Sequence, residues 1–235
     1  PVDVSTSSRA TLGGMTANNS CGARSIRYGT SRDNVLAIDA VLADGTSARF
    51  GPHMPGQNHA VPDLIGDLLA LGAREAAEIG ARFPDVARRV GGYNIDALVA
   101  DGAPVNLAHL LVGSEGTLAL SERITLKLSP LPGEKVLGVC HFPSFYEAMD
   151  ATQHIVTLGP TAVELFDRTI LDLAWDIPIF RPALQKFVRG APEALLIVEF
   201  AEPDRGENLR RLAALSDLMA ELGFRWEDGA KGEGG

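Results

Sequence analysis

The sequence predicts an α+β protein in two domains, and three features lead to this prediction. Two β-rich stretches flank Asp44-Gly45 within residues 34–51, and this dipeptide readily takes the positive φ values of a tight hairpin turn. Apolar residues at helical spacing follow over residues 62–84 and end at a proline. Two prolines within 130–132 interrupt both ladders and helices, and strand and helix patterns alternate after them.

The first domain is expected to span residues 1–133. Its first thirty residues are dense in Ser, Thr, Gly and Asn, which predicts loops joined by short strands. The hairpin comes next, followed by an amphipathic helix over Asp63–Phe83 and a strand near the end of the domain. These elements predict a mainly antiparallel sheet flanked by the helix. The apolar residues of the last strand recur at even positions, namely Leu118, Leu120, Ile124, Leu126 and Leu128.

The second domain is expected to span residues 134–235 and to pack separately. Its pattern is that of a layer in which strands and helices alternate. The tail over 229–235 has no core-forming residue and is expected to be mobile. The predicted strands are Lys135–Phe142, Thr161–Phe166 and Leu195–Ala201, and the predicted helices are Ser144–Leu158 and Asp204–Leu222.

Composition favours a small-molecule role. The formal net charge of −9 and the pI near 5.0 argue against nucleic acid or an anionic membrane as partner, because both would be repelled. No apolar run is long enough for a transmembrane helix. Cys21 and Cys140 are the two cysteines and form no CxxC pair, so this chain cannot build a disulfide framework, an iron–sulfur site or a cysteine zinc site. A cytoplasmic location is the simplest expectation.

The segment over Ser5–Tyr28 is the strongest candidate for a binding site. Gly13 and Gly14 lack a Cβ, so backbone amides there can approach a ligand closely. Hydroxyl groups and the amides of Asn18 and Asn19 add donors and acceptors. Such a loop suits phosphates and the polar edge of a flat heterocycle. An irregular turn region without a ligand is the alternative, and for this composition alone it is the more common one.

A second candidate is VGSEGTLALSERITL, in which Gly113 and Gly116 bracket Glu115 before a strand. Consecutive N–H groups in such a turn can bind an anion or a purine edge, although a plain strand-entry turn fits equally well. The patterns GxGxxG, GxxxxGK[ST] and GxSxG do not occur. The five histidines show no metal-ligand spacing, so no metal site is expected. Glu164 and Asp167 could belong to a site, but a helix cap is the more common role at a strand end.

Four ordered segments together resemble the FAD-linked oxidases related to vanillyl-alcohol oxidase. The similarity points to the branch of D-lactate, glycolate and D-2-hydroxyglutarate dehydrogenases, above all to large bacterial FAD and iron–sulfur fusion members. Residues 142–167 also resemble the start of that family's ferredoxin-like cap. One departure is Ala119, where the family usually has Gly. The matching segments are DVSTSSRATLGGMTANNSCGARSIRYG, VLAIDAVLADG, RRVGGYNIDAL and LLVGSEGTL.

The resemblance implies a noncovalent FAD, bound by the second half of an FAD-binding domain in residues 1–133, with a partial substrate cap in residues 134–235. The first FAD subdomain, the later cap residues and the iron–sulfur cysteines are expected outside this chain, so any iron–sulfur cluster would lie elsewhere in the longer protein. No catalytic residue is assigned. The residues implied to lie near the cofactor are Ser5, Thr6, Gly13, Gly14, Asn18, Asn19, Gly22 and, on the adenine side, Ile124.

The implied activity of the intact enzyme is oxidation of a 2-hydroxy acid by hydride transfer to the flavin N5. The chain alone is expected to be inactive and to hold FAD weakly or not at all. A homodimer is left open as its assembly, and the electron acceptor is not assigned. Two alternatives stay open: a flavin reductase of the same fold, and a noncatalytic fragment that has lost its cofactor.

Overall fold

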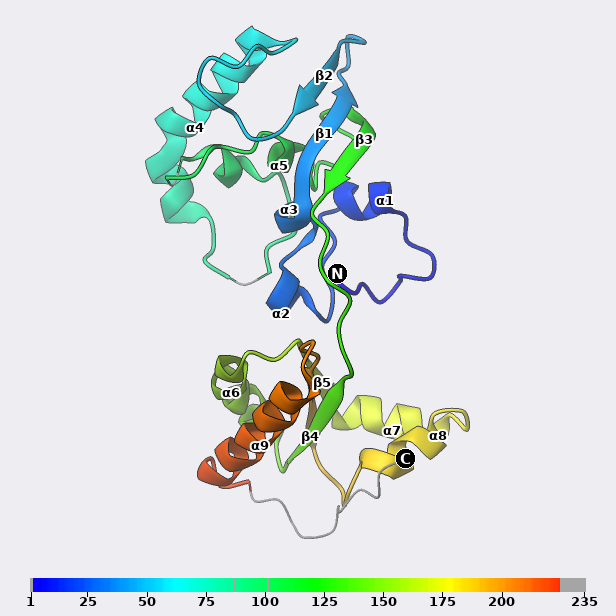
Figure 1. The fold of residues 1–235 in the computed structure, drawn as a ribbon. Coiled ribbons are helices and arrows are strands. Elements are labelled where there is room, and N and C mark those ends of the chain that lie inside the picture. The colour runs from blue at the N-terminus through cyan, green and yellow to red at the C-terminus, as the bar shows by residue number, and fades with distance from the viewer. Residues whose placement is uncertain (1, 87, 101, 225–235) are drawn as a thin grey trace. The chain divides into compact units, whose positions relative to one another are not determined.

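The structure is a computed structural model that describes residues 2–86, 88–100 and 102–224. The chain forms two compact units that divide between Ser129 and Pro130 (Figure 1). We call them unit 1 and unit 2. The expected domain boundary, 133/134, lies a few residues further along. The prediction for the tail over 229–235 falls outside the described residues. In the described part of the chain, every helix is too short or too polar to span a lipid bilayer.

Unit 1 contains a three-stranded sheet in the order β2-β1-β3. The central strand, β1 (Val35–Val41), pairs antiparallel with β2 (Ser47–Phe50) across the predicted turn and with β3 (Leu120–Leu126) on its other side. The long helix, α4 (Pro62–Arg82), begins at its proline and packs with α5 (Ala108–Leu111) on the core of this sheet (Figure 1). The hairpin, the helix and the antiparallel sheet are therefore confirmed.

The even-numbered apolar pattern around β3 is confirmed at Leu118, Ile124 and Leu126, which pack on the core, but not at Leu120 or Leu128. Ile124 pairs with Ile38 and packs on the core, whereas Leu120 is 69% exposed and Leu128 88% exposed. The strand pairing shifts where Glu122 stands as an extra residue. A bulge of this kind reverses the alternation, because one residue of slip moves each following side chain to the other face.

The first thirty residues fold into short helices, which corrects the prediction of short strands. The described part of this segment contains α1 (Leu12–Ala17) and α2 (Ser25–Tyr28), and α3 (Ser31–Asn34) follows. Thr11 caps α1 by accepting a hydrogen bond from the Gly14 amide at 3.0 Å. Polar turn-forming residues thus act here as caps, since their side chains satisfy the first amides of a short helix.

Helix α4 comes very close to the short 3₁₀ helix η1 (Ile95–Leu98) at Gly72. A Cβ on Gly72 would lie inside van der Waals contact with the Leu98 carbonyl oxygen, whereas a Cβ on Gly66 of the same helix would meet nothing within 4 Å. We expect Gly72→Ala to lower the free energy of unfolding of unit 1 by about 1–3 kcal/mol. The control Gly66→Ala should raise it by about 0.5–1 kcal/mol, because alanine is the better helix former.

Hydrogen exchange of the α4 amides at increasing urea concentration measures both changes, since it reports the stability of unit 1 by itself. Equal effects of the two substitutions would contradict the close packing of α4 against η1.

Unit 2 contains a second antiparallel sheet, in the order β4-β6-β5, with helices on both faces (Figure 1). One face packs against α6 and α9, and the other against α7 and α8. Each strand and helix that the sequence predicts in this unit is confirmed. The bounds are β4 (Val136–Phe142), α6 (Phe145–Ile155), η2 (Val156–Leu158), β5 (Ala162–Asp167), α7 (Arg168–Asp176), α8 (Arg181–Phe187), β6 (Ala194–Phe200) and α9 (Arg205–Glu221).

Helices α7 and α8 were not predicted. The carboxylate of Asp167 caps α7 by accepting a hydrogen bond from the Ile170 amide at 2.8 Å. The prediction that a carboxylate at this strand end caps a helix is therefore confirmed for Asp167.

The Cys140 side chain of β4 lies on the opposite face of this sheet, in the core against α6 and α9. Burial raises the pKa of its thiol to about 12, so Cys140 is an inert core residue.

Candidate functional site

The two candidate segments of the sequence meet in unit 1. The Gly113 amide donates to the Thr16 carbonyl at 3.0 Å, and the Glu115 amide donates to the Ala17 carbonyl at 2.9 Å. Residues 112–117, the glycine turn, are thereby joined to the end of α1. The sequence marks both segments as candidates, and these backbone hydrogen bonds join them.

Asn19 fixes the point at which these segments meet. It is 1% exposed and has a φ of 50°, in the left-handed region where Asn is one of the few tolerated side chains. Its Oδ1 accepts a hydrogen bond from the Arg32 amide at 2.9 Å. Gly113 has a φ of 81°, and a Cβ there would lie 3.2 Å from the Asn19 Cβ. This close approach requires a small residue at Gly113 as well as the left-handed backbone.

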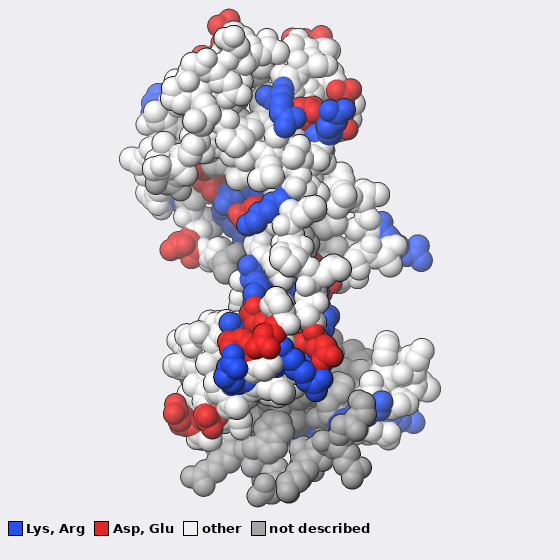
Figure 2. All heavy atoms as spheres, in the orientation of Figure 1, with Lys and Arg blue, Asp and Glu red and all other residues white. Residues whose placement is uncertain are grey.

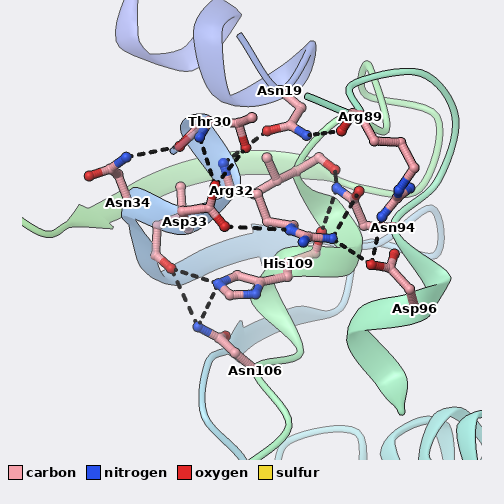
Figure 3. Close-up of polar contacts among 12 residues, drawn as sticks. Asn19, Thr30, Arg32, Asp33, Asn34, Arg89, Asn94, Asp96, Asn106 and His109 are labelled. Carbon is pink, nitrogen blue, oxygen red and sulfur yellow. Dashed lines mark hydrogen bonds and ion pairs between the residues drawn. The ribbon is translucent and has the colours of Figure 1, made fainter. Parts of the chain in front are cut away.

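An ion-pair cluster lies beside this contact (Figure 3). Asp96 Oδ2 forms ion pairs with the guanidinium groups of Arg32, at 2.8 Å, and of Arg89, at 2.6 Å. Burial acts to raise the pKa of Asp96, but the hydrogen bonds and charges of Arg32 and Arg89 outweigh it and hold the pKa below its ordinary value. Asp96 is therefore ionised at neutral pH and links Arg32 of α3 with Arg89 of the loop that follows α4.

Asn94 and His109 connect the cluster to the glycine turn and the sheet (Figure 3). The Asn94 amide group, 1% exposed, donates to the Val112 carbonyl at 2.8 Å and lies 3.4 Å from the Arg32 guanidinium. His109 Nε2 lies 3.1 Å from the Val35 carbonyl oxygen. Burial, aided by the charge of Arg32, holds the pKa of His109 below its ordinary value, so a structural neutral ring is expected at pH 7.

The predicted cofactor residues divide into exposed and packed sets. Asn19 is buried, Gly22 is wedged against the backbone of Val2 and Asp3, and Ile124 points into the core of unit 1. The exposed set can meet a ligand directly, whereas the packed set can only shape the loop or the strand that carries it. The exposed set is Ser5, Thr6, Gly13, Gly14 and Asn18.

The exposed set fits FAD in its donor chemistry. Thr6 and its serine neighbours present hydroxyl groups, a Cβ on Gly13 would meet no protein atom within 4 Å, and the adjoining Leu12 is 63% exposed. A polar edge beside an apolar side chain suits a flavin or its pyrophosphate. Residues 1–34 hold four arginines and two aspartates, a local charge of +2 in a chain of −9. That local charge favours an anion.

Groups of three or more metal-ligating side chains do not occur among residues 2–86, 88–100 and 102–224. In the loop after β2, His53 Nδ1 and His59 Nε2 lie 3.1 Å apart. This distance is that of a hydrogen bond between the two imidazole rings, so a bound metal is not needed to explain it.

Comparison with protein families identifies the class. Residues 1–51 match the FAD binding domain model, and residues 131–227 match the model of the C-terminal domain of FAD linked oxidases. The first match includes the exposed loop and β1, and the second covers most of unit 2. The chain therefore belongs to the family of FAD linked oxidases.

Several of the relatives that it resembles are named dehydrogenases. It is 30% identical to D-2-hydroxyglutarate dehydrogenase of Pantoea ananatis, over 98% of this chain and 24% of that protein. It is also 30% identical to the D-2-hydroxyglutarate dehydrogenase of Escherichia coli, over 94% of this chain and 23% of that protein. Among solved structures, alkyldihydroxyacetonephosphate synthase shares the fold, with a TM-score of 0.54 and 18% identity. The match covers 91% of this chain and 32% of the synthase chain. The chain spans about a quarter of the length of these curated relatives.

Proposed function

We propose that this chain is part of an FAD-dependent dehydrogenase that oxidises a D-2-hydroxy acid. The observation that supports the proposal most is the junction of the glycine turn with α1, the helix that carries the exposed Gly13 and Gly14. Bound FAD would supply the acceptor for the hydride that leaves the carbinol carbon of the substrate. The names of the relatives point to D-2-hydroxyglutarate and D-lactate as the first substrates to test.

In this proposal the residues of unit 1 bind and orient the cofactor. Thr6 and Ser5 offer hydroxyl donors to phosphate oxygens or to the polar edge of the flavin, and Gly13 leaves room for close approach. Asn19 and Gly22 shape the loop from its packed side, and Ile124 supports the strand on the adenine side. Unit 2 is proposed to contribute to the cap over the substrate, while the catalytic base is not assigned to any residue of this chain.

The test is turnover of the whole protein with an artificial electron-accepting dye. We expect D-2-hydroxyglutarate or D-lactate to bleach the flavin absorbance under anaerobic conditions and to reduce the dye in its presence. Bleaching by a reduced nicotinamide but by neither acid would instead support a reductase of the same fold. Protein that carries no flavin and reduces no dye would contradict the proposal.

A further inference from the structure

The loop over Arg89–Asp96 touches both segments of the candidate cofactor surface, although it lies outside the part of the chain that matches the FAD binding domain model. Asn19 Nδ2 donates to the Arg89 carbonyl at 3.4 Å, which ties this loop to the end of α1. Asn94 donates to the carbonyl before Gly113, and Tyr93 Oη lies 2.8 Å from Thr117 Oγ1. One loop therefore holds the α1 segment on one side and the glycine turn on the other (Figure 3).

Asp96 is the charged centre of these contacts. The Oδ2 atom of Asp96 binds the guanidinium groups of Arg32 and Arg89. Both arginines also bind Asn19 through their backbone: the Arg32 amide donates to Asn19 Oδ1, and the Arg89 carbonyl accepts from Asn19 Nδ2. Its other oxygen, Oδ1, is buried and has no hydrogen-bond partner among the described residues. The two guanidinium groups on Oδ2 are thus the main compensation for a partly buried charge. Loss of the charge would leave both arginines without this shared anion.

We infer that Asp96 is a positioning residue for the cofactor surface, acting through Arg32, Arg89 and Asn94 to hold the α1 segment against the glycine turn. The inference rests on the proposed function for its cofactor and on contacts within unit 1 for its geometry. It assigns a role to the RRVGGYNIDAL segment. Asp96 itself touches no atom of the exposed set, so its effect on FAD would come through the backbone of Asn19 and Gly113.

The chain offers a matched control. Asp39 on β1 also pairs with two arginines, Arg49 at 2.7 Å and Arg123 at 3.7 Å, and its side chain is 26% exposed against 24% for Asp96. Figure 2 shows acidic and basic side chains side by side over the sheet of unit 1. Asp39→Asn therefore removes the same kind of charge from the same unit, at a residue whose printed partners, Arg49 and Arg123, lie outside both α1 and the glycine turn.

The experiment compares Asp96→Asn and Asp39→Asn in the whole protein with two measurements. The first is hydrogen exchange of the Gly113 and Glu115 amides, which donate to the α1 segment, measured after FAD has been removed. We expect exchange at these amides to be at least tenfold faster in Asp96→Asn and unchanged within twofold in Asp39→Asn. The second is the FAD dissociation constant, expected to rise about tenfold for Asp96→Asn alone, equivalent to about 1.4 kcal/mol.

The inference is overturned if Asp96→Asn leaves these two amides unchanged, or if Asp39→Asn accelerates them as much. Faster exchange with an unchanged FAD dissociation constant would overturn the link to the cofactor. If the parent protein binds no FAD, the proposed function fails, and the exchange measurement alone still decides whether Asp96 positions the two segments.

Discussion

Gly13→Val is expected to raise the FAD dissociation constant of the whole protein by about 10–100-fold while changing the free energy of unfolding by no more than about 0.5 kcal/mol. A Cβ at Gly13 would meet nothing within 4 Å beyond its own neighbours and helix backbone, so we expect a larger side chain there to cause little strain within the chain. The groups that it would obstruct are those of a bound ligand. Flavin absorbance retained after exhaustive dialysis measures the first quantity, and urea unfolding of the flavin-free protein measures the second.

Gly14→Val serves as the comparison for this prediction. A Cβ on Gly14 would lie 3.1 Å from Thr11 Oγ1, which caps α1, so this substitution should perturb the cap as well as FAD binding. We expect it to weaken FAD retention by more than it weakens folding, with a larger loss of stability than Gly13→Val causes. Unchanged FAD content in both variants would show that the glycines do not face the cofactor.

Asn208→Ala is expected to lower the free energy of unfolding of unit 2 by about 3–5 kcal/mol. The side chain is 0% exposed and makes three hydrogen bonds to backbone groups. Its Oδ1 accepts from the Glu202 amide at 2.7 Å, and its Nδ2 donates to the carbonyls of Glu134 and Glu202, each at 2.9 Å. Removing it leaves these partly buried backbone groups without their side-chain partner. Urea unfolding followed by the fluorescence of Trp175 in α7 measures the change.

The control for Asn208 lies at the start of the same helix, α9. Asp204 is its exposed N-cap and accepts from the amides of Gly206 and Glu207 at 3.2 and 3.0 Å. Asp204→Ala should cost about 1 kcal/mol, the ordinary effect of a lost cap. A loss for Asn208→Ala no greater than that of the cap would contradict the role of Asn208 in joining the start of β4 to the end of β6.

The parts of the fold that the sequence predicted well depend on local signals. Asp44-Gly45 marks the hairpin and Pro62 the start of α4, because each acts on its own backbone. The exposure of Leu120 was not predictable in this way, since the bulge at Glu122 exists only in the pairing with β1. Short capped helices such as α1 were also missed, because the same polar residues favour loops and caps.

The candidate site was predictable as two segments and not as a network. Gly13, Gly14 and Gly113 stand out in the sequence because glycine permits close approach and positive φ. The pairing of Arg32 with Asp96 joins residues far apart in the chain, and no spacing in the sequence indicates it. Asn94 carries a weak signal, an amide between glycines and an apolar run, but its burial becomes evident only when the glycine turn packs on it.

The flavin content of the whole protein tests whether unit 1 belongs to a flavoprotein and presents Gly13 and Gly14 of α1 to FAD. The protein would be purified without added cofactor, heat-denatured, and the released flavin identified and quantified by chromatography. We expect about one molecule of FAD per chain, bound noncovalently, and much less FAD from Gly13→Val. Whole, folded protein that releases no flavin and acquires none when incubated with FAD would contradict the account.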